Sequence, residues 1–213
     1  IVVGAGPAGL LAATRAAERG RRTLLLEKGR RPGAKILISG GTRCNLTHAA
    51  DRRAIVEAFG SQGRFLHSAL AALGPEDLIA LVEREGVRTK VEPGGKVFPV
   101  TDRAVDVQAA LVQRLRRSGC ELALEEPLQE LAREDQGFRL VTSRRTLWAA
   151  RVVLTTGGRS YPGCGTTGDG YRLAAGLGHA IEPPRPALVP VPRLLPNWLS
   201  GTAGSASVSG PGS

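Results

Sequence analysis

Short apolar runs alternate with amphipathic segments along the first half of the chain. Residues 1–3 and 23–27 are nearly continuous apolar runs, a pattern typical of buried parallel strands. The segment between them is predicted to be a helix that begins near Pro7, because a proline suits the first helical turn, where its missing N–H would have no partner. A strand, a helix and a second strand at the start of the chain predict an α/β fold.

The pattern after residue 50 adds helices and a second group of strands. A meander of short extended pieces separated by turn residues leads into an apolar strand at 151–154. A meander in place of a crossover helix is typical of FAD domains of the glutathione-reductase type, rather than of nicotinamide dehydrogenases. We therefore predict a Rossmann-like FAD-binding domain with a parallel sheet, flanking helices and an antiparallel crossover. The expected helices are 52–59, 64–73, 75–85, 104–118 and 170–177, and the expected strands are 87–91, 96–100, 121–124, 128–133, 138–142 and 146–149.

The composition of the chain changes near residue 183. Prolines cluster between Pro183 and Pro196, and residues 201–213 are small and polar. We expect residues 1–182 to form the FAD-binding domain. Residues 183–213 are expected to be a proline-rich exit toward a missing substrate domain, with a disordered polar tail.

Composition and charge narrow the class of protein. The 213 residues carry a net charge of +10, but the arginines are scattered without interleaved aromatic residues. We therefore expect an anionic cofactor and a small-molecule substrate, and we do not expect nucleic acid as a partner.

No apolar run approaches the roughly 20 residues of a membrane span, so no membrane association is predicted. Cys44, Cys120 and Cys164 lack metal-ligand spacing and cannot all pair with one another, which favours a reducing cytoplasm.

A glycine motif follows the first predicted strand. In this GxGxxG sequence Gly4 permits the turn, Gly6 lets a pyrophosphate approach the backbone, and Gly9 lets the next helix pack closely. The N-terminal amides and the dipole of that helix favour phosphate. Glu27 ends the second strand at the distance expected of a ribose-binding carboxylate. A glycine-rich turn without a ligand is the alternative, but the flanking strands and the acid favour a dinucleotide site.

Residues 29–47 are predicted to be a glycine-rich loop that contributes to the same site. Ser39 and Gly40 would present backbone N–H groups to phosphate or ribityl oxygens, as anion-binding loops do. Lys35 and Arg43 would neutralise charge on phosphate or on a reduced flavin. The alternative is a surface loop whose glycines only relieve backbone strain.

A second glycine-rich loop, residues 155–171, leaves a strand at the edge where α/β sheets bind ligands. Asp169 in this loop suits either a helix N-cap or a contact with a ligand. The cysteines on the two loops form no CxxC motif, so we expect no disulfide exchange by Cys44 or Cys164.

Several sequence motifs in a fixed order resemble one known family. The segments IVVGAGPAGL, LLLEK, GAKILISGGTRCNLT, KVFPVTDRAVDV and TTGGRSYPGCGTTGDGYRLAAGLGH resemble the BaiN/RdsA-type flavoproteins, also called YhiN-like or aminoacetone-oxidase-like enzymes. The resemblance implies an NAD(P)/FAD-dependent oxidoreductase, of which at least one branch reduces double bonds of 3-oxo bile-acid intermediates. FAD is the implied cofactor and NAD(P)H a candidate reductant, while the catalytic residues stay unassigned.

The resemblance also implies a set of cofactor-binding residues. Gly4, Gly6, Gly9 and Glu27 match the ADP half of the site, with Lys28 beside the adenosine. The family's crossover strand passes the adenine at Leu128, and its ATG-like turn is Thr156–Gly157 here. The full set is Gly4, Gly6, Pro7, Ala8, Gly9, Glu27, Lys28, Lys35, Ser39, Gly40, Arg43, Cys44, Asn45, Leu128, Thr156 and Gly157.

The chain departs from this family near Arg193, where the family continues into an inserted substrate domain and a second flavin-contacting segment. We therefore expect a fragment, or a truncated or frameshifted product, with little catalysis of its own. Two other functions fit the residues. One is an NAD(P)-binding dehydrogenase domain without flavin. The other is a non-catalytic nucleotide- or RNA-binding flavoprotein scaffold, suggested by the basic charge.

Overall fold

The computed structural model describes residues 1–185, of which Ile1–Ile181 form one compact unit. The predicted proline-rich exit and polar tail, from residue 186 onward, lie outside the described residues. The unit is built around a four-stranded parallel sheet with the strand order β10 (Val153–Leu154), β1 (Val2–Val3), β2 (Leu24–Leu26) and β6 (Glu121–Ala123). All four correspond to strands expected from the sequence, and the predicted parallel sheet is confirmed.

Successive residues of the central strands face opposite sides of the sheet, as the period of a strand requires. Val2 and Leu25 belong to one apolar core, together with α1 (Pro7–Glu18) and α6 (Ala104–Arg117). Val3 and Leu26 belong to a second core on the other face. The central strands β1 and β2 each lie between two parallel neighbours, and both faces of the sheet are covered. Because they are buried on both faces, these strands are continuously apolar.

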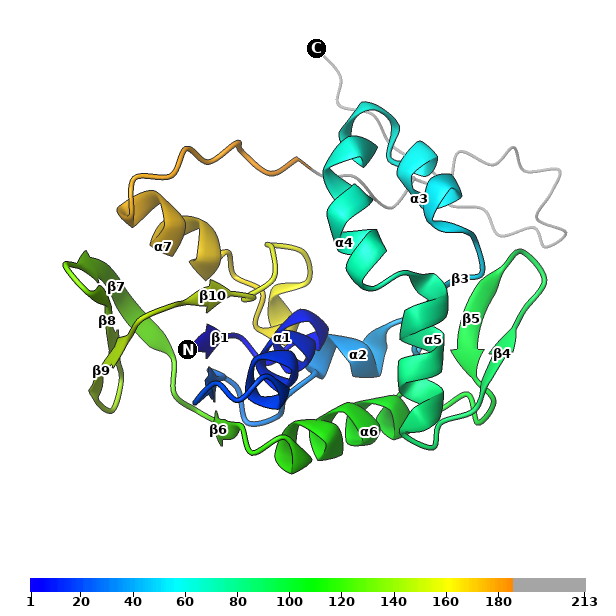
Figure 1. The fold of residues 1–213 in the computed structure, drawn as a ribbon, viewed down its shortest axis with the longest axis horizontal. Helices are drawn as coiled ribbons and strands as arrows, with labels where there is room; N and C mark the ends of the chain where they lie inside the picture. The colour runs from blue at the N-terminus through cyan, green and yellow to red at the C-terminus, as the bar shows by residue number, and fades with distance from the viewer. Residues whose placement is uncertain (186–213) are drawn as a thin grey trace, which may run out of the picture. The chain divides into compact units, whose positions relative to one another are not determined.

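The second face of the parallel sheet is covered by an antiparallel meander and by α7 (Asp169–Gly176) (Figure 1). The meander consists of β7 (Leu128–Glu134), β8 (Gly137–Thr142) and β9 (Thr146–Ala149), and it connects β6 to β10. Glu126, at the entrance to β7, is 2% exposed. Its carboxylate accepts hydrogen bonds from Arg145 Nε at 2.9 Å and Thr142 Oγ1 at 2.9 Å, which fixes the start of the meander to its second turn. The antiparallel crossover is thus confirmed.

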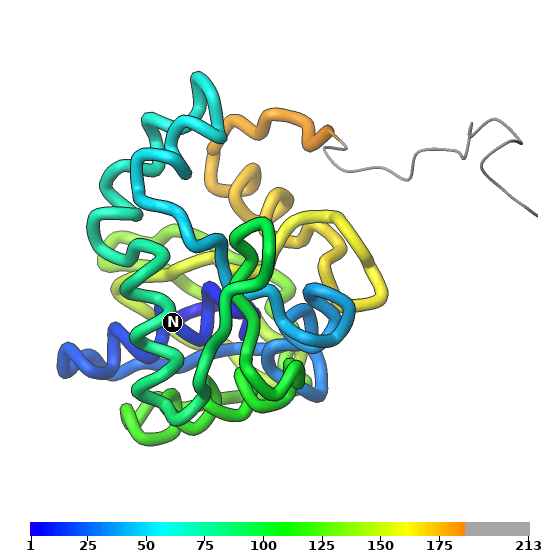
Figure 2. Tube along the Cα trace, turned by 90° about the vertical axis from the view of Figure 1, so that its right-hand side faces the viewer, coloured from blue at the N-terminus to red at the C-terminus, as the bar shows by residue number. Residues whose placement is uncertain are grey.

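The chain between β2 and α6 makes a long excursion, which Figure 2 shows from the side. Two expectations needed correction there. The predicted loop 29–47 contains a short helix and a strand, and the predicted helix 64–73 is divided into a 3-10 segment and a shorter α-helix. The elements are α2 (Ala34–Ile38), β3 (Thr47–His48), α3 (Arg52–Ala58), η1 (Gly60–Leu66), α4 (His67–Ala72), α5 (Pro75–Arg84), β4 (Thr89–Val91) and β5 (Lys96–Pro99).

One stretch of this excursion, Gly60–Arg84, is long and apolar enough by length and composition to count as a candidate membrane span, which the sequence analysis did not anticipate. The backbone leaves the helical conformation at Leu73, with φ of −151° and ψ of 89°. Helices in the core of globular proteins can have the same length and composition. These two properties alone therefore do not identify the stretch as a membrane span.

Candidate functional site

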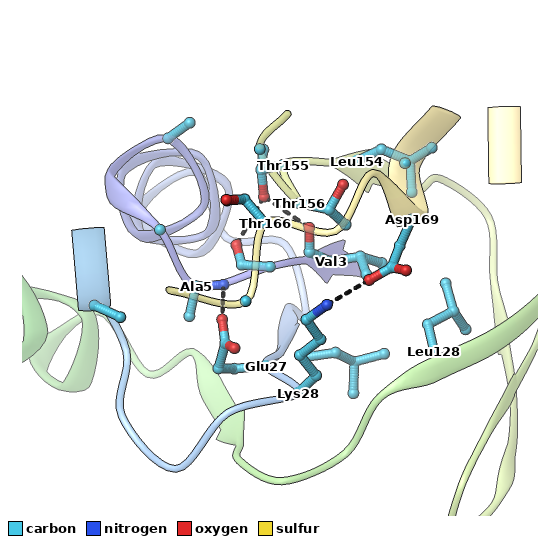
Figure 3. Close-up of a pocket in the computed structure, with 18 of the residues that line it drawn as sticks. Val3, Ala5, Glu27, Lys28, Leu128, Leu154, Thr155, Thr156, Thr166 and Asp169 are labelled. Atoms are coloured by element: carbon cyan, nitrogen blue, oxygen red, sulfur yellow. Dashed lines mark hydrogen bonds and ion pairs between the residues drawn. The ribbon is translucent and has the colours of Figure 1, made fainter. Parts of the chain in front are cut away.

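A cavity of about 590 Å³ opens at the carboxyl edge of the parallel sheet (Figure 3). This volume lies within the roughly 300–1,000 Å³ of typical ligand pockets. Residues that follow the strand ends form its wall: Gly4 after β1, Glu27 after β2, Glu126 after β6 and Thr155 after β10. Ligands of open α/β sheets bind at this edge, so the fold brings the glycine motif and the second glycine-rich loop to the expected place.

The three glycines of the motif have different surroundings. Gly4 has a φ of +98°, and a Cβ there would stand 2.7 Å from the carbonyl oxygen of Thr155. A Cβ on Gly9 would overlap the carbonyl oxygen of Gly4 and stand 2.7 Å from Thr155 Oγ1. Apart from Gly6 itself and its two neighbours in the chain, no protein atom lies within 4 Å of the place where a Cβ of Gly6 would be. Gly4 and Gly9 therefore allow close packing, whereas Gly6 leaves open space at the start of α1.

The N-terminus of α1 is suited to an anion. Its N-cap is Gly6, which has no side chain to accept a bond from the first amides, and its first turn contains no acidic residue. Pro7 and Ala8 of that turn line the cavity. The free amides and the positive end of the helix dipole favour a phosphate group in the space beside Gly6.

Glu27 lies in the cavity wall with its carboxylate held by two backbone groups. Oε2 accepts a hydrogen bond from the Ala5 amide and Oε1 one from the Gly29 amide, each at 2.7 Å. Each carboxylate oxygen has a further lone pair. The carboxylate therefore fixes the turn after β1 and still has acceptor capacity for ribose hydroxyls, the role predicted from the sequence.

The turn after β10 is fastened to the turn after β1. Thr155 Oγ1 donates to the carbonyl oxygens of Val3 at 2.9 Å and of Gly4 at 2.8 Å. Thr156 and Gly157 line the cavity directly beyond this contact, and Gly157 has a φ of +74°. Leu128 lines the cavity from the first residue of β7. The residues proposed for the adenine and pyrophosphate ends of a dinucleotide thus share one cavity.

Two lysines reach across the cavity. Lys28 Nζ donates to Asp169 Oδ2 at 2.6 Å and to Thr167 Oγ1 at 2.8 Å. Lys35 Nζ donates to the carbonyl oxygen of Ser160 at 2.9 Å. The hydrogen bond from Lys28 is the main cause that lowers the pKa of Asp169 below its ordinary value. Of the two roles considered for Asp169, the structure does not show the N-cap, because Gly168 occupies that position and the Asp169 carboxylate accepts a bond from Lys28.

The structure adds cavity residues that the motifs did not indicate. They lie in three places: the segments that flank β2 and β7, the second glycine-rich loop at 155–171, and the first turns of α7. The sequence placed that loop at the binding edge but did not single out these residues within it. They include Arg31, Glu126, Cys164, Thr166, Tyr171 and Leu173.

Residues 39–45 do not line this cavity. Arg43 stacks over the Phe98 ring at 4.0 Å and pairs with Glu92 at 2.6 Å and Asp102 at 3.6 Å. The hydrogen bond that Arg43 donates to Glu92 is the main cause that raises the pKa of Arg43. This set of partners holds Arg43 against Phe98 of β5, and Gly40 packs beside the same ring. Ser39, Gly40, Cys44 and Asn45 are likewise absent from the cavity wall.

Cys44 is a buried core residue with a φ of +65°. Burial raises the pKa of its thiol to about 11, so the thiol is protonated at neutral pH and poorly nucleophilic. Cys164 lines the cavity and is partly exposed. All three cysteines are free thiols.

The parallel sheet, the antiparallel crossover and the glycine turn beneath the cavity define a Rossmann-like FAD-binding fold. Comparison with known proteins gives the particular family. The chain belongs to the family described as HI0933-like protein Rossmann domain, whose model matches residues 1–210. The resemblance inferred from the sequence motifs is thereby confirmed.

Two curated relatives illustrate the family. The ribosomal RNA dihydrouridine synthase of Escherichia coli K12 is 36% identical over 193 residues, which are 89% of this chain and 47% of the relative. The 3-dehydro-bile acid delta(4,6)-reductase of Clostridium scindens is 31% identical over 190 residues, which are 88% of this chain and 46% of the relative. The chain therefore spans about half the length of these relatives.

Among solved structures, Thermovibrio ammonificans THI4 is similar to this chain at 16% identity, with a TM-score of 0.49, over 73% of this chain and 56% of that chain.

Proposed function

We propose that this chain is the cofactor-binding part of an FAD-dependent oxidoreductase that transfers hydride between flavin and a small organic substrate or NAD(P)H. The observation that carries the proposal is the cavity at the carboxyl edge, where the open space at Gly6 adjoins the uncapped N-terminus of α1. The antiparallel crossover favours FAD over a nicotinamide cofactor as the tightly bound group.

Within this proposal the chain's own residues bind and orient the cofactor. Gly6, Pro7 and Ala8 would hold the pyrophosphate, and Glu27 would accept hydrogen bonds from ribose hydroxyls. Lys28 and Leu128 would lie at the adenosine. FAD, when bound, would supply the hydride chemistry, while the protein sets its position and electrostatic surroundings.

The proposed site extends from the adenosine toward the flavin. Lys35, Thr156 and Gly157 would line the cavity on the way from the pyrophosphate to the ring, and Gly4 and Gly9 would support the turn from behind. The assignment of residues 39–45 to the flavin end stays a prediction for the intact protein.

We also propose that residues 1–182 form the cofactor domain and that residues 183–213 lead toward a substrate domain. We further propose that the protein works in a reducing cytoplasm, which its three free thiols support.

The direction of reaction that we favour is reduction. The two relatives are named for forming a dihydro product and for reducing delta(4,6) positions, and both names describe the addition of hydrogen to a carbon–carbon double bond. We therefore propose that the substrate carries a double bond conjugated to a carbonyl group.

A second candidate substrate is a uracil base in RNA. It is favoured by the name of the Escherichia coli relative and by the net charge of +10. The expectation against nucleic acid thus stays a prediction that the following experiment can decide.

The intact protein would be purified, loaded with FAD and reduced anaerobically with NADH or NADPH. The reduced protein would then be mixed in parallel with a cyclic enone and with unmodified ribosomal RNA, and reoxidation of the flavin would be followed by visible absorbance. Reoxidation with a product heavier by two hydrogens is expected in one of the two mixtures. Mass spectrometry of the enone or of digested nucleosides identifies which one. A protein that retains no FAD after gel filtration contradicts the proposal.

A further inference from the structure

We propose that the loop from Gly157 to Gly168 is a strap across the dinucleotide cavity and that Lys28 and Lys35 fasten it, so that these two lysines control how long a bound dinucleotide is retained. The inference rests on the proposed function, because it concerns the same cavity. It assigns Lys28, Lys35 and Asp169 as positioning residues that act through the strap.

The strap forms one wall of the cavity and has few other attachments. Cys164, Gly165 and Thr166 line the cavity. The backbone hydrogen bonds of the strap are internal, for example from the Cys164 amide to the Tyr161 carbonyl oxygen and from the Gly165 amide to the Pro162 carbonyl oxygen. Among residues 1–185, its hydrogen bonds to the chain outside the segment from β10 to α7 come from Lys28 and Lys35 alone.

The two fastenings act at different points of the strap. Lys28 holds its C-terminal end through Thr167 and Asp169, and Figure 3 shows the bond from Lys28 to Asp169 inside the pocket. Lys35 holds its middle through the Ser160 carbonyl oxygen at 2.9 Å and Thr166 Oγ1 at 3.3 Å. Both lysines belong to the segment after β2, whereas the strap follows β10. The contacts therefore clamp two opposite walls of the cavity together.

The ends of the strap have the backbone freedom that a moving segment needs. Gly157 has a φ of +74° and Gly168 a φ of +87°, conformations that glycine adopts without a steric penalty. Hinge residues are typically a few positions at the ends of elements. Between these glycines the strap carries the exposed Arg159 and Tyr161, which is 65% exposed. Loss of either lysine contact therefore loosens the strap at one of its two attachment points and leaves the hydrogen bonds of the sheet in place.

Tryptic cleavage after Arg159 measures release of the strap without any cofactor. In the intact protein we expect Lys28→Met and Asp169→Asn each to raise the rate of this cleavage by about twofold to fivefold, the upper part of the range for a partly exposed ion pair. The double variant should be no faster than Lys28→Met alone, because Lys28→Met already removes the bond to Asp169. Lys28→Arg keeps the charge and should restore slow cleavage. Lys90→Met is the matched control, since Lys90 pairs with Asp102 at 2.5 Å and similar exposure outside the cavity.

FAD dissociation, measured by displacement into excess apoprotein, supplies the second readout. The same variants should release FAD faster by a factor close to that seen in proteolysis. Unchanged cleavage after Arg159, or additive effects in the double variant, would overturn the proposal. Faster FAD release by Lys28→Met with normal cleavage would also overturn it, because Lys28 would then act on the cofactor directly. Absence of FAD binding in every variant refutes the proposed function but leaves the proteolysis test of the strap intact.

Discussion

Gly6 and Gly9 provide a direct test of the cavity, because alanine at the two positions should have opposite effects. Gly6 lies in open space with a φ of −70°, a conformation open to alanine. Gly6→Ala should therefore leave the free energy of unfolding unchanged or raise it by about 0.4–1 kcal/mol through the loss of freedom in the unfolded chain. Gly9→Ala would place a methyl group against the Gly4 carbonyl oxygen. Because that oxygen belongs to the turn after β1, it cannot move aside without disturbing the sheet.

The expected magnitudes follow from these surroundings. Overpacking costs about 1–3 kcal/mol where side chains can adjust, so we expect Gly9→Ala to lower the free energy of unfolding by at least about 3 kcal/mol. The methyl group of Gly6→Ala would fill the space that we assign to the pyrophosphate. Loss of one charge-assisted hydrogen bond is worth about 1.5–3 kcal/mol, so FAD affinity should fall by roughly tenfold to more than a hundredfold.

Urea denaturation without FAD measures the first quantity, and titration followed by flavin fluorescence measures the second. Gly176→Ala serves as a control, because the Cβ position of this glycine in α7 also meets no atom beyond its chain neighbours and its own helix backbone, and Gly176 does not line the cavity. It should retain full FAD affinity. The reasoning is refuted if Gly6→Ala binds FAD as well as the unmodified protein does, or if Gly9→Ala keeps its stability.

Three further predictions concern carboxylates and thiols. The hydrogen bond from Arg145 is the main cause that lowers the pKa of Glu126. Its stabilising contribution should therefore be complete above the unfolded-state pKa of about 4.3 and disappear as pH falls through the lower folded-state value. Glu126→Gln should flatten that acid limb in urea titrations, and an unchanged limb would argue against it. Cys44 should resist a thiol reagent at mildly alkaline pH while Cys164 reacts, as mass spectrometry of the labelled peptides can establish; rapid labelling of Cys44 would contradict its burial. Glu27→Ala should lower the free energy of unfolding by about 1–3 kcal/mol even without FAD, because two backbone N–H groups lose their acceptor. Equal urea midpoints would exclude that structural role.

The parts of the fold that the sequence predicted well are those in which local pattern and packing agree. The β1–α1–β2 unit combines continuous apolar strands with a glycine turn and a proline at the first helical position. The three strands of the meander could be predicted because turn residues separate them in the sequence. Helix α2 was missed because it has only five residues, begins after a left-handed Gly33 and lies in a glycine-rich segment. Its one buried residue, Ile36, is too little for a periodic signal.

The partners of the site residues were harder to predict than the residues themselves. Lys28 and Asp169 are separated by 141 positions, and Lys35 and Ser160 by 125. Only the strand order brings them together. Strands β2 and β10 both pair with β1, so their carboxyl ends lie about 9–10 Å apart at the strand spacing of a sheet. A lysine from one end and an aspartate from the other can span that gap. Residue spacing along the chain identified both glycine-rich loops, but the contact between them depends on β10 pairing with β1, about 150 positions earlier in the sequence.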